Sequence, residues 1–406
     1  MQASMRLPFA LLCTVPFIMV LGNSMLVPLL PKMKEAMAVS LFQVSLFITG
    51  FSLPAGITIP FAGFLSDRFG RKIIMAPALI LYGTGGLLAG TAALLAAQPY
   101  YLILGSRILQ GIGAGGTYQL AMALVGDIFQ SNERAKALGL LEASNGLGKV
   151  ISPIAGALLG LITWFAPFFA YGFLAIPVGI AIWLIVREPK QGIGQHRTIA
   201  SYFGSLKQIF KEKGTGLLAC FLAGMTVLFL LFGVLSLVAD SLEAKGWEGI
   251  KIGLLLALPV GSMALTSYLC GSYLQKKSAR ILKLTLVAGL GLVAGALLLM
   301  GFRLPIYLFL IALILLGVGT GSVLPAVNTL ITSSTSASQR GGITCLYGSM
   351  RFLGVALGPP VFGLAATLEN LTLFGLAAAL TFAVTLLAAF LVHVREMLPP
   401  DLLTQT

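Results

Sequence analysis

The chain carries little charge for its length. Charged residues make up 10% of its 406 residues, hydrophobic residues make up 58%, and the mean hydropathy is +0.98. A soluble domain has about 25% charged residues because its surface faces water. The composition therefore excludes an ordinary soluble protein. The net charge of +13 does not require a nucleic-acid partner, since cytoplasmic loops of membrane proteins collect Lys and Arg.

The residues that usually build catalytic or metal sites are also scarce. The sequence has two histidines, and its four cysteines lie singly in apolar stretches without a CxxC pair. It contains no GxxxxGK[ST] loop, which argues against an ATP-driven pump. We therefore expect no enzyme, no catalytic residue, no metal and no cofactor. A channel remains compatible with the composition, while nothing in the sequence supports a receptor.

Apolar runs long enough to cross about 30 Å of hydrocarbon recur along the whole chain. The first follows Arg6 and has no convincing cleavage site, so we expect a retained span rather than a signal peptide. The predicted spans are 8–31, 41–66, 73–96, 101–127, 136–160, 164–186, 215–240, 252–274, 281–301, 304–332, 341–366 and 371–394. The sequence thus predicts an all-α membrane protein of twelve transmembrane helices. We expect two six-helix bundles, 1–186 and 215–406, joined by a linker, 187–214, of which 201–213 is either a short amphipathic helix or a plain tether.

Lysine and arginine are distributed unequally between the two sides of these spans. If the N-terminus is cytoplasmic, the inner segments hold 18 of these residues and the outer segments hold 5. Such an excess marks the cytoplasmic side. We expect a multi-pass protein of the cell membrane, with both termini and the linker in the cytoplasm.

The two halves share a repeat at a constant offset of 206 residues. The equivalent positions are Gly111, Gly113, Gly115, Arg134, Gly148 and Pro153 in the first half, and Gly317, Gly319, Gly321, Arg340, Gly354 and Pro359 in the second. An even number of spans per half makes the repeats parallel, an arrangement known in transporters. Because one chain contains both halves, we expect a monomer in the lipid bilayer.

The loop after the second span carries a recognisable motif, GFLSDRFGRK at residues 63–72. Glycine permits close packing and tight turns, and an acid is favoured at a helix N-terminus, the position we expect for Asp67. The motif resembles the loop signature of the major facilitator superfamily. The resemblance implies a conformational latch in which Arg71 reaches Asp127 at the end of the fourth span; the alternative is a plain basic loop. The predicted latch residues are Gly63, Asp67, Arg68, Gly70, Arg71 and Asp127.

Two further motifs resemble signatures of the same superfamily. RILQGIGAG, beginning at Arg107, resembles its fourth-helix signature, which implies a part in proton coupling; the alternative is an arginine that snorkels to the interface. GLGKVISPIAG at 146–156 resembles the fifth-helix signature of the twelve-helix drug/proton antiporter branch, although Ser152 replaces a glycine and Lys149 is an added cation. The predicted helix-packing residues are Gly148, Ser152, Pro153, Gly156, Gly354, Gly358 and Pro359.

Ionisable residues inside spans are functional candidates. Glu142, Asn145 and Lys149 share one face of the fifth span, and Glu142 is the acid that we place deepest in the membrane. A proton-driven exporter needs a group that binds a proton on one side and releases it on the other, so we expect Glu142 to carry the proton. The alternative is an ion pair of Glu142 with Lys149 or Arg107 that only joins helices.

Three cations in the spans against one acid favour a neutral or anionic amphipathic substrate, such as an acidic metabolite or a catecholate siderophore. The first span offers Asn23 where relatives in the drug-export branch have an acid, which weakens the analogy with exporters of cationic drugs. We therefore expect a secondary active transporter that exports small amphipathic compounds by alternating access, driven by the proton gradient. The alternative is a nutrient importer or facilitator. The predicted cavity residues are Asn23, Asn145, Lys149, Arg351, Tyr118, Phe229 and Tyr347.

Overall fold

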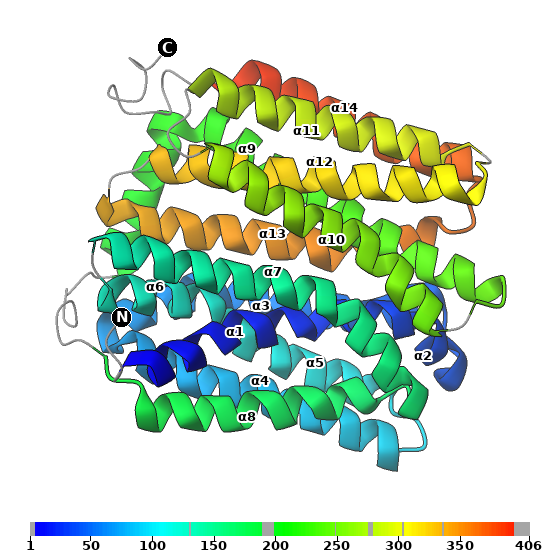
Figure 1. Ribbon diagram of the computed structural model, residues 1–406, viewed down its shortest axis with the longest axis horizontal. Helices are drawn as coiled ribbons and strands as arrows, with labels where there is room; N and C mark the ends of the chain where they lie inside the picture. Colours follow the sequence, from blue (N-terminus) through cyan, green and yellow to red (C-terminus); the bar gives the residue numbers. More distant parts are fainter. Residues whose placement is uncertain are drawn as a thin grey trace. The chain divides into compact units, whose positions relative to one another are not determined.

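The structure is a computed structural model that describes residues 5–129, 131–188, 199–247, 249–274, 279–302, 304–334 and 337–393. Within these ranges every regular element is a helix (Figure 1). The helices are α1 Arg6–Ser24, η2 Val27–Leu29, α2 Leu30–Met37, α3 Leu41–Phe69, α4 Arg71–Leu95, α5 Tyr100–Gly115, α6 Tyr118–Ile128, α7 Ser131–Ile162, α8 Ala166–Ile185, α9 Ile199–Ala244, α10 Gly249–Leu274, α11 Ala279–Met300, α12 Ile306–Ser333, α13 Ala337–Ala365 and α14 Asn370–Leu391. The predicted all-α architecture is confirmed.

Ten helical segments of the described chain are long and apolar enough to cross a membrane. The remaining two predicted spans correspond to α5 with α6 and to α13. The fourth span was expected as one helix, but it is interrupted at Gly116 and Thr117. Four glycines between 111 and 116 explain the break, because glycine costs a helix about 1 kcal/mol relative to alanine.

The first predicted span is also interrupted. α1 ends at Ser24, and a single turn of 3-10 helix, Val27–Leu29, leads into α2. Pro28 and Pro31 lie in this stretch and lack the backbone N–H that a continuous helix would use. The break leaves the carbonyl groups of the last turn of α1 available for side chains.

The predicted linker is described only from residue 199. Residues 199–212 form the first part of α9, and the helix is interrupted at Lys213, whose φ of −129° is not helical. The helical alternative for this stretch is therefore confirmed, whereas residues 189–198 lie outside the described part of the chain.

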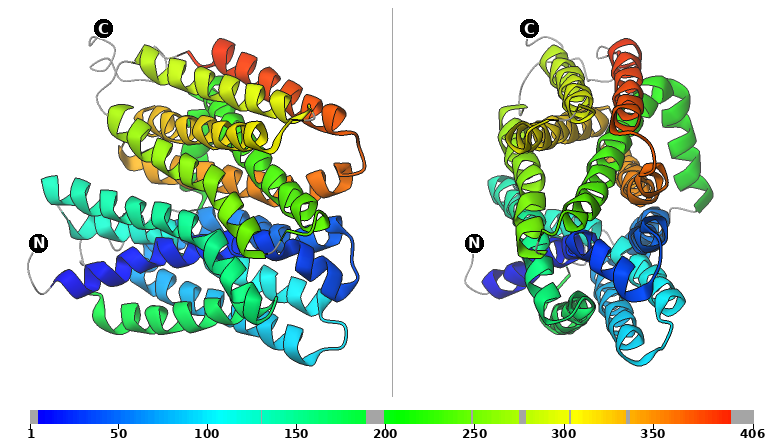
Figure 2. Two further views of the ribbon diagram at one scale, coloured as in Figure 1. Left: turned by 45° about the vertical axis from the view of Figure 1, so that its right-hand side comes forward. Right: turned by 90° about the vertical axis from the view of Figure 1, so that its right-hand side faces the viewer.

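The chain divides into two compact units. Unit 1 contains Met1–Ile199 and Val238–Ala257, and unit 2 contains Ala200–Leu237 and Leu258–Thr406. In unit 1, α4 packs against α5 and α8, α1 against α7, and α3 against α5; in unit 2, α11 packs against α12 and α14 (Figures 1 and 2). The end of α9 and the start of α10 thus group with unit 1, although both helices were assigned to the second bundle.

The repeated glycines lie where helices touch through their backbones. A Cβ on Gly111 of α5 would be 2.2 Å from the carbonyl oxygen of Phe51 in α3. A Cβ on Gly317 of α12 would be 2.1 Å from the carbonyl oxygen of Pro259 in α10. The neighbouring repeat pair also behaves alike, because Gly113 abuts α4 and Gly319 abuts α11. The sequence repeat therefore corresponds to the same helix contacts in each unit.

The predicted helix-packing motif makes contacts of the same kind. A Cβ on Gly156 of α7 would be 2.1 Å from the carbonyl oxygen of Met25, and one on Gly148 would be 3.2 Å from that of Phe17. In unit 2, Cβ atoms on Gly354 and Gly358 of α13 would lie 2.2 and 2.3 Å from carbonyl oxygens of α9. Within the described chain, these residues let α7 approach the α1–α2 region and α13 approach α9, as predicted.

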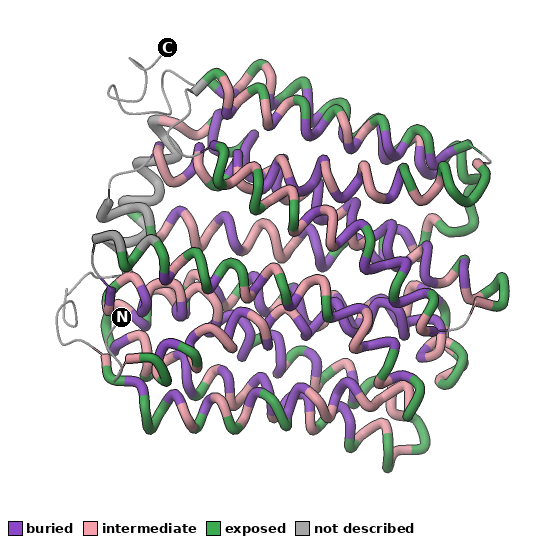
Figure 3. The backbone as a smooth tube through the Cα atoms, viewed as in Figure 1, coloured by how far each residue is buried: buried purple, intermediate pink, exposed green. Residues whose placement is uncertain are grey.

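Large apolar side chains cover much of the surface. Leu95 is 81% exposed, Leu184 is 74% exposed and Phe390 is 72% exposed. Buried and exposed segments alternate along α8 and α14 (Figure 3). Such extensive apolar exposure is unfavourable in water and is typical of helices that face hydrocarbon. The chain is a multi-pass membrane protein.

Candidate functional site

The predicted latch forms at the junction of α3 and α4. Arg71, the first residue of α4, places Nη2 2.5 Å from a carboxylate oxygen of Asp67 and Nε 3.6 Å from one of Asp127. Its Nη1 also donates to Ser66 Oγ at 2.6 Å. The predicted contact between Arg71 and Asp127 is confirmed, and it joins the start of α4 to the end of α6.

Two parts of the latch prediction are wrong. Asp67 lies in the last turn of α3, not at a helix N-terminus, and it is held there by Arg71. Arg68 forms no ion pair with a described residue and instead lies over the ring of Phe69, with 5.4 Å from Cζ to the ring centre. Gly70 adopts a φ of +110°, which confirms the predicted tight turn. The packing role of Gly63 stays a prediction.

The acid at the N-terminus of α4 is Glu188, which the sequence analysis did not single out. Its two carboxylate oxygens accept hydrogen bonds from the backbone N–H groups of Arg71 at 2.5 Å and Lys72 at 3.1 Å. A carboxylate is favoured there because these N–H groups lack partners within the helix. The chain after α8 therefore clamps the start of α4. Its only signal in the sequence is an acid placed among the cations that follow the sixth span.

Arg107 lies at the centre of a buried polar cluster in unit 1. Its side chain is fully buried. Nε donates to the carbonyl oxygen of Phe47 at 3.0 Å, and Nη1 donates to Gln110 Oε1 at 2.6 Å. Nη2 donates to the carbonyl oxygen of Gly22 and to Asn23 Oδ1, each at 2.8 Å. The snorkelling alternative is therefore wrong.

The cluster stabilises the end of α1. Gly22 and Asn23 belong to its last turn, where carbonyl groups lack helical partners and the helix dipole favours a cation. Tyr82 donates to the carbonyl oxygen of Ile18 at 3.0 Å, and Tyr171 donates to that of Leu21 at 3.2 Å. Asn23 is buried within this cluster, so its predicted place in the substrate cavity is wrong.

Glu142 lies on α7, about 17 Å along the axis from the start of that helix at 1.5 Å per residue. Its side chain is exposed, and its carboxylate accepts a hydrogen bond from the hydroxyl of Tyr118, the first residue of α6. The structure thus brings together a predicted cavity residue and the predicted proton carrier. Lys149, two turns further along α7, is half-buried, and its predicted pairing with Glu142 stays a prediction.

The other predicted cavity residues have different surroundings. Asn145 is buried, and its amide donates to the carbonyl oxygen of Pro16 at 3.4 Å, so it joins α7 to α1 instead of facing a cavity. In unit 2, Phe229 packs edge-on against Phe362, with ring centres 5.8 Å apart. Tyr347 and Arg351, also in unit 2, lie on consecutive turns of α13. The predicted cavity residues therefore lie in both units and do not share one face of a single unit.

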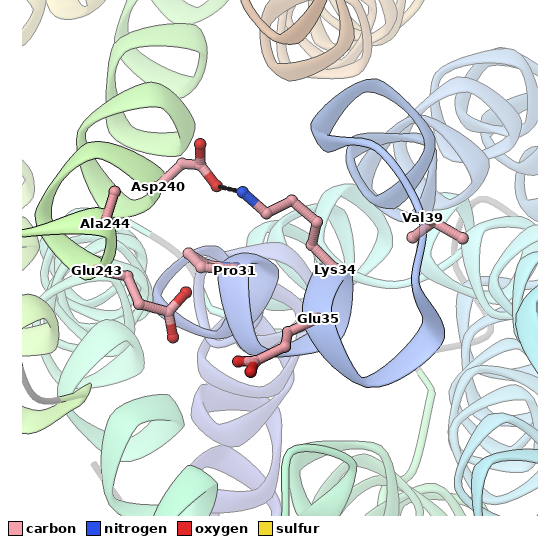
Figure 4. A pocket seen from close by; sticks show the side chains of 7 residues that line it. All are labelled: Pro31, Lys34, Glu35, Val39, Asp240, Glu243 and Ala244. Atoms are coloured by element: carbon pink, nitrogen blue, oxygen red, sulfur yellow. Dashed lines mark hydrogen bonds and ion pairs between the residues drawn. The ribbon is translucent and has the colours of Figure 1, made fainter. Parts of the chain in front are cut away.

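A second charged cluster occupies the opposite end of unit 1 from the latch. Lys34 of α2 forms an ion pair with Asp240 of α9, beside a cavity of about 350 Å³ (Figure 4). Its lining residues are Pro31, Lys34, Glu35, Val39, Asp240, Glu243 and Ala244. Lys32 donates to the carbonyl oxygen of Gly160 at 3.2 Å and so caps the end of α7. This cluster joins helices from the two sequence repeats within a single unit.

Breaking the ion pair is expected to loosen this contact. We expect Asp240→Asn to raise by about two- to five-fold the rate at which a maleimide labels Val39→Cys, measured without the four native cysteines. The pair is partly exposed, at 34% and 22%, so its contribution is about 1 kcal/mol at most. The charge-reversed variant Lys34→Asp/Asp240→Lys should restore the slow rate. Equal labelling in all three proteins would show that the pair does not hold this contact.

Comparison with known proteins identifies the family. The family model of the Major Facilitator Superfamily matches residues 12–359 and, in a second match, 283–404. The chain is 39% identical over 388 residues to the bacillibactin exporter of Bacillus subtilis (strain 168), covering 95% of this chain and 96% of that one. It is 29% identical over 364 residues to the multidrug efflux protein YfmO of the same organism, covering 87% and 84%.

Solved structures share the fold. A bacterial homologue of the human lysosomal transporter Spinster, in an inward-facing and occupied conformation, has a TM-score of 0.74 and 16% identity, covering 98% of both chains. The human organic anion transporter MFSD10 has a TM-score of 0.73 and 20% identity, covering 96% of this chain and all of that one. Because all these proteins are transporters and the matches cover the chain, it is a transporter and not an enzyme. The chain belongs to the Major Facilitator Superfamily and is one of its efflux transporters.

Proposed function

We propose that this transporter exports a small anionic or neutral amphipathic compound in exchange for protons. The observation that carries the proposal is the carboxylate of Glu142, which lies well within the length of α7 and is bonded by Tyr118. An ionisable residue within a membrane-spanning helix is a functional candidate. The proton gradient supplies the energy, and no further cofactor takes part.

The proposed exchange needs one group that takes up and releases the proton. Glu142 binds a proton from the outer side, which removes its charge, and gives it up to the cytoplasm after the cavity opens inward. Tyr118 donates a hydrogen bond to this carboxylate. Substrate leaves on the outer side when the proton enters. Each cycle therefore moves a proton inward through Glu142 and substrate outward.

The composition of the spans and one relative support the substrate class. Lys149 and Arg351 lie in the predicted spans outside the Arg107 cluster, whereas Glu142 is the acid that we placed deepest in the membrane. This excess of cations disfavours a cationic substrate. The relative that is 39% identical is named a bacillibactin exporter, and we propose a siderophore or a similar organic anion for this chain as well.

The membrane arrangement is part of the proposal. The ratio of 18 to 5 Lys and Arg residues between the two sides supports cytoplasmic termini in the cell membrane. In this orientation the Arg71 latch is cytoplasmic, and the Lys34–Asp240 cluster is on the outer side. We propose that the monomer is sufficient for transport, since one chain contains both repeats.

Proteoliposomes with an imposed proton gradient and a pH-sensitive dye inside test the exchange. We expect wild type to move protons when 2,3-dihydroxybenzoate is present on the side from which it is exported. Glu142→Gln should reduce this substrate-dependent proton flux at least about 100-fold, because proton transfer by a positioned group contributes typically 10²–10⁴-fold.

The matched control is Glu369→Gln. Glu369 precedes α14 and is exposed, and its side chain makes no capping hydrogen bond with that helix. It should transport as wild type does. Substrate flux that ignores the proton gradient, equal in wild type and Glu142→Gln, would instead identify a facilitator, the alternative function, and would leave Glu142 a structural residue.

A further inference from the structure

Arg351 is a cation at the middle of a membrane-spanning helix whose own unit offers it no acid. It is the fifteenth of 29 residues of α13, about 21 Å along the axis from either end at 1.5 Å per residue. The acids in the sequence of unit 2 are Glu212, Glu369, Glu396 and Asp401, each outside the predicted spans. No acid of unit 2 is therefore available at the depth of Arg351.

Arg351 also lacks the hydrogen bonds that would compensate its charge. Within the described chain it forms no ion pair, and its Nε is buried without a hydrogen-bond partner although the residue as a whole is half-buried. The contrast with Arg107 is direct, since that guanidinium makes four hydrogen bonds. A donor nitrogen that is buried without a partner is expensive. A ligand-binding role explains such a residue better than a structural role does.

Neighbouring aromatic rings hold Arg351 in place. Its guanidinium lies over the ring of Tyr347, one turn earlier on α13, with 5.7 Å from Cζ to the ring centre. Tyr347 is in turn stacked on Phe221 of α9, with ring centres 5.9 Å apart and an angle of 27° between the rings. Gly224 leaves room for the tyrosine, because a Cβ there would be 2.5 Å from the hydroxyl oxygen. Tyr347 is therefore a positioning residue for Arg351.

We infer that Arg351 is the anion-binding residue of unit 2 and that it recognises a carboxylate or phenolate oxygen of the exported compound. The planar guanidinium suits the two oxygens of a carboxylate. Its Nε and the hydroxyl of Tyr347 are buried, so the terminal nitrogens of the half-buried guanidinium are the donors that a ligand would reach. A lipid phosphate is a poor candidate because the residue lies about 21 Å from each helix end.

The repeat supports different roles for the two units. The offset of 206 residues carries Asn145 to Arg351, so equivalent positions on α7 and α13 hold a neutral amide and a cation. Asn145 uses its amide to join α7 to α1, while Arg351 has no such contact within the described chain. Unit 1 thus carries the proposed proton group, and unit 2 carries the anion site. The inference rests on the proposed export of an anion.

Direct binding tests the site without transport. Protein in nanodiscs of phosphatidylcholine would be titrated with 2,3-dihydroxybenzoate and with the neutral 2,3-dihydroxybenzamide. We expect wild type to prefer the anion, Arg351→Gln to bind it about 30-fold more weakly, and Arg351→Lys to lose less. The benzamide affinity should be similar in all three proteins. Arg280→Gln, which removes an exposed cation at the start of α11, is the matched control and should bind as wild type.

Thermal unfolding separates a ligand site from a structural role. Without ligand, Arg351→Gln should unfold at the same temperature as wild type or higher, because it removes a charge that lacks partners. Adding 2,3-dihydroxybenzoate should raise the unfolding temperature of wild type and not that of the variant. A lower unfolding temperature for the variant, equal anion binding in variant and wild type, or no preference of wild type for the anion would each overturn the inference.

The same experiments keep the two proposals apart. Anion binding that depends on Arg351, found together with flux that ignores the proton gradient, would refute the proposed exchange and leave the anion site in place. Proton-coupled flux that is unchanged in Arg351→Gln would refute the anion site and leave the proposed exchange in place.

Discussion

Replacing Gly111 with alanine is expected to prevent the protein from reaching its native fold. The added Cβ would lie 2.2 Å from the carbonyl oxygen of Phe51 and 2.9 Å from its carbonyl carbon. These are backbone atoms of α3, so no side chain can turn aside to relieve the overlap. The helices would have to separate, at a cost of about 3 kcal/mol or more. The yield of monodisperse protein and its unfolding temperature in detergent measure the loss.

Two other glycine substitutions serve as comparisons, one at the repeat-equivalent position and one on the same helix. Gly317→Ala should be equally damaging, because its Cβ would lie 2.1 Å from the carbonyl oxygen of Pro259. Gly105→Ala, on the same helix as Gly111, has nothing within 4 Å of its Cβ and should be neutral or stabilising by up to about 1 kcal/mol. Equal stability of the Gly105 and Gly111 variants would refute the proposed backbone contact.

Replacing Arg107 with glutamine is expected to lower stability by about 3 kcal/mol and to reduce transport severely. The substitution removes four hydrogen bonds from a fully buried site and leaves the carbonyl groups at the end of α1 with fewer partners. Arg107→Lys should also be damaging, because one ammonium group does not reproduce the planar set of donors. Thermal unfolding and proton-driven flux in proteoliposomes measure the two effects.

The comparison with Arg351→Gln makes this prediction specific. Both substitutions remove an arginine from a predicted span, yet we expect unfolding temperatures to fall for Arg107 and not for Arg351. The difference follows from their surroundings, since four hydrogen bonds hold the first guanidinium, whereas the second lies over the ring of Tyr347 and has a buried Nε without a partner in the described chain. An equal loss of stability in both variants would show that the hydrogen bonds of the buried cluster do not stabilise the protein through Arg107.

Several site contacts could be anticipated from residues alone. The cation at Arg71 and the acid at Asp127 stand at the ends of neighbouring spans on the same side, and the loop motif points to their pairing. Tyr118 and Glu142 were both selected as unusual polar residues in apolar runs, and they form a hydrogen bond. Their pairing was not predicted, because it depends on the break before α6, which places Tyr118 as the first residue of that helix.

Other contacts could not be predicted from the sequence. Arg107 finds its partners in backbone carbonyl groups, which every residue has and which no side-chain pattern reveals. Asn23 was read as a cavity residue because it replaces an acid, whereas it is buried beside Arg107 and donates to Ser52 Oγ at 2.5 Å. Glu188 was read as part of a basic linker, although it caps α4 across more than a hundred residues of sequence.

Residues alone predicted the membrane-spanning helices, the repeat, the resemblance to the family and the glycines that permit close packing. These depend on local hydropathy and on residue size at fixed spacing, both of which are legible along the chain. The tertiary structure alone decided which charges have partners. That depends on where helices cross and where they break, and those points bring together carbonyl groups and side chains from distant segments. The same guanidinium is therefore a structural tie at Arg107 and an available cation at Arg351.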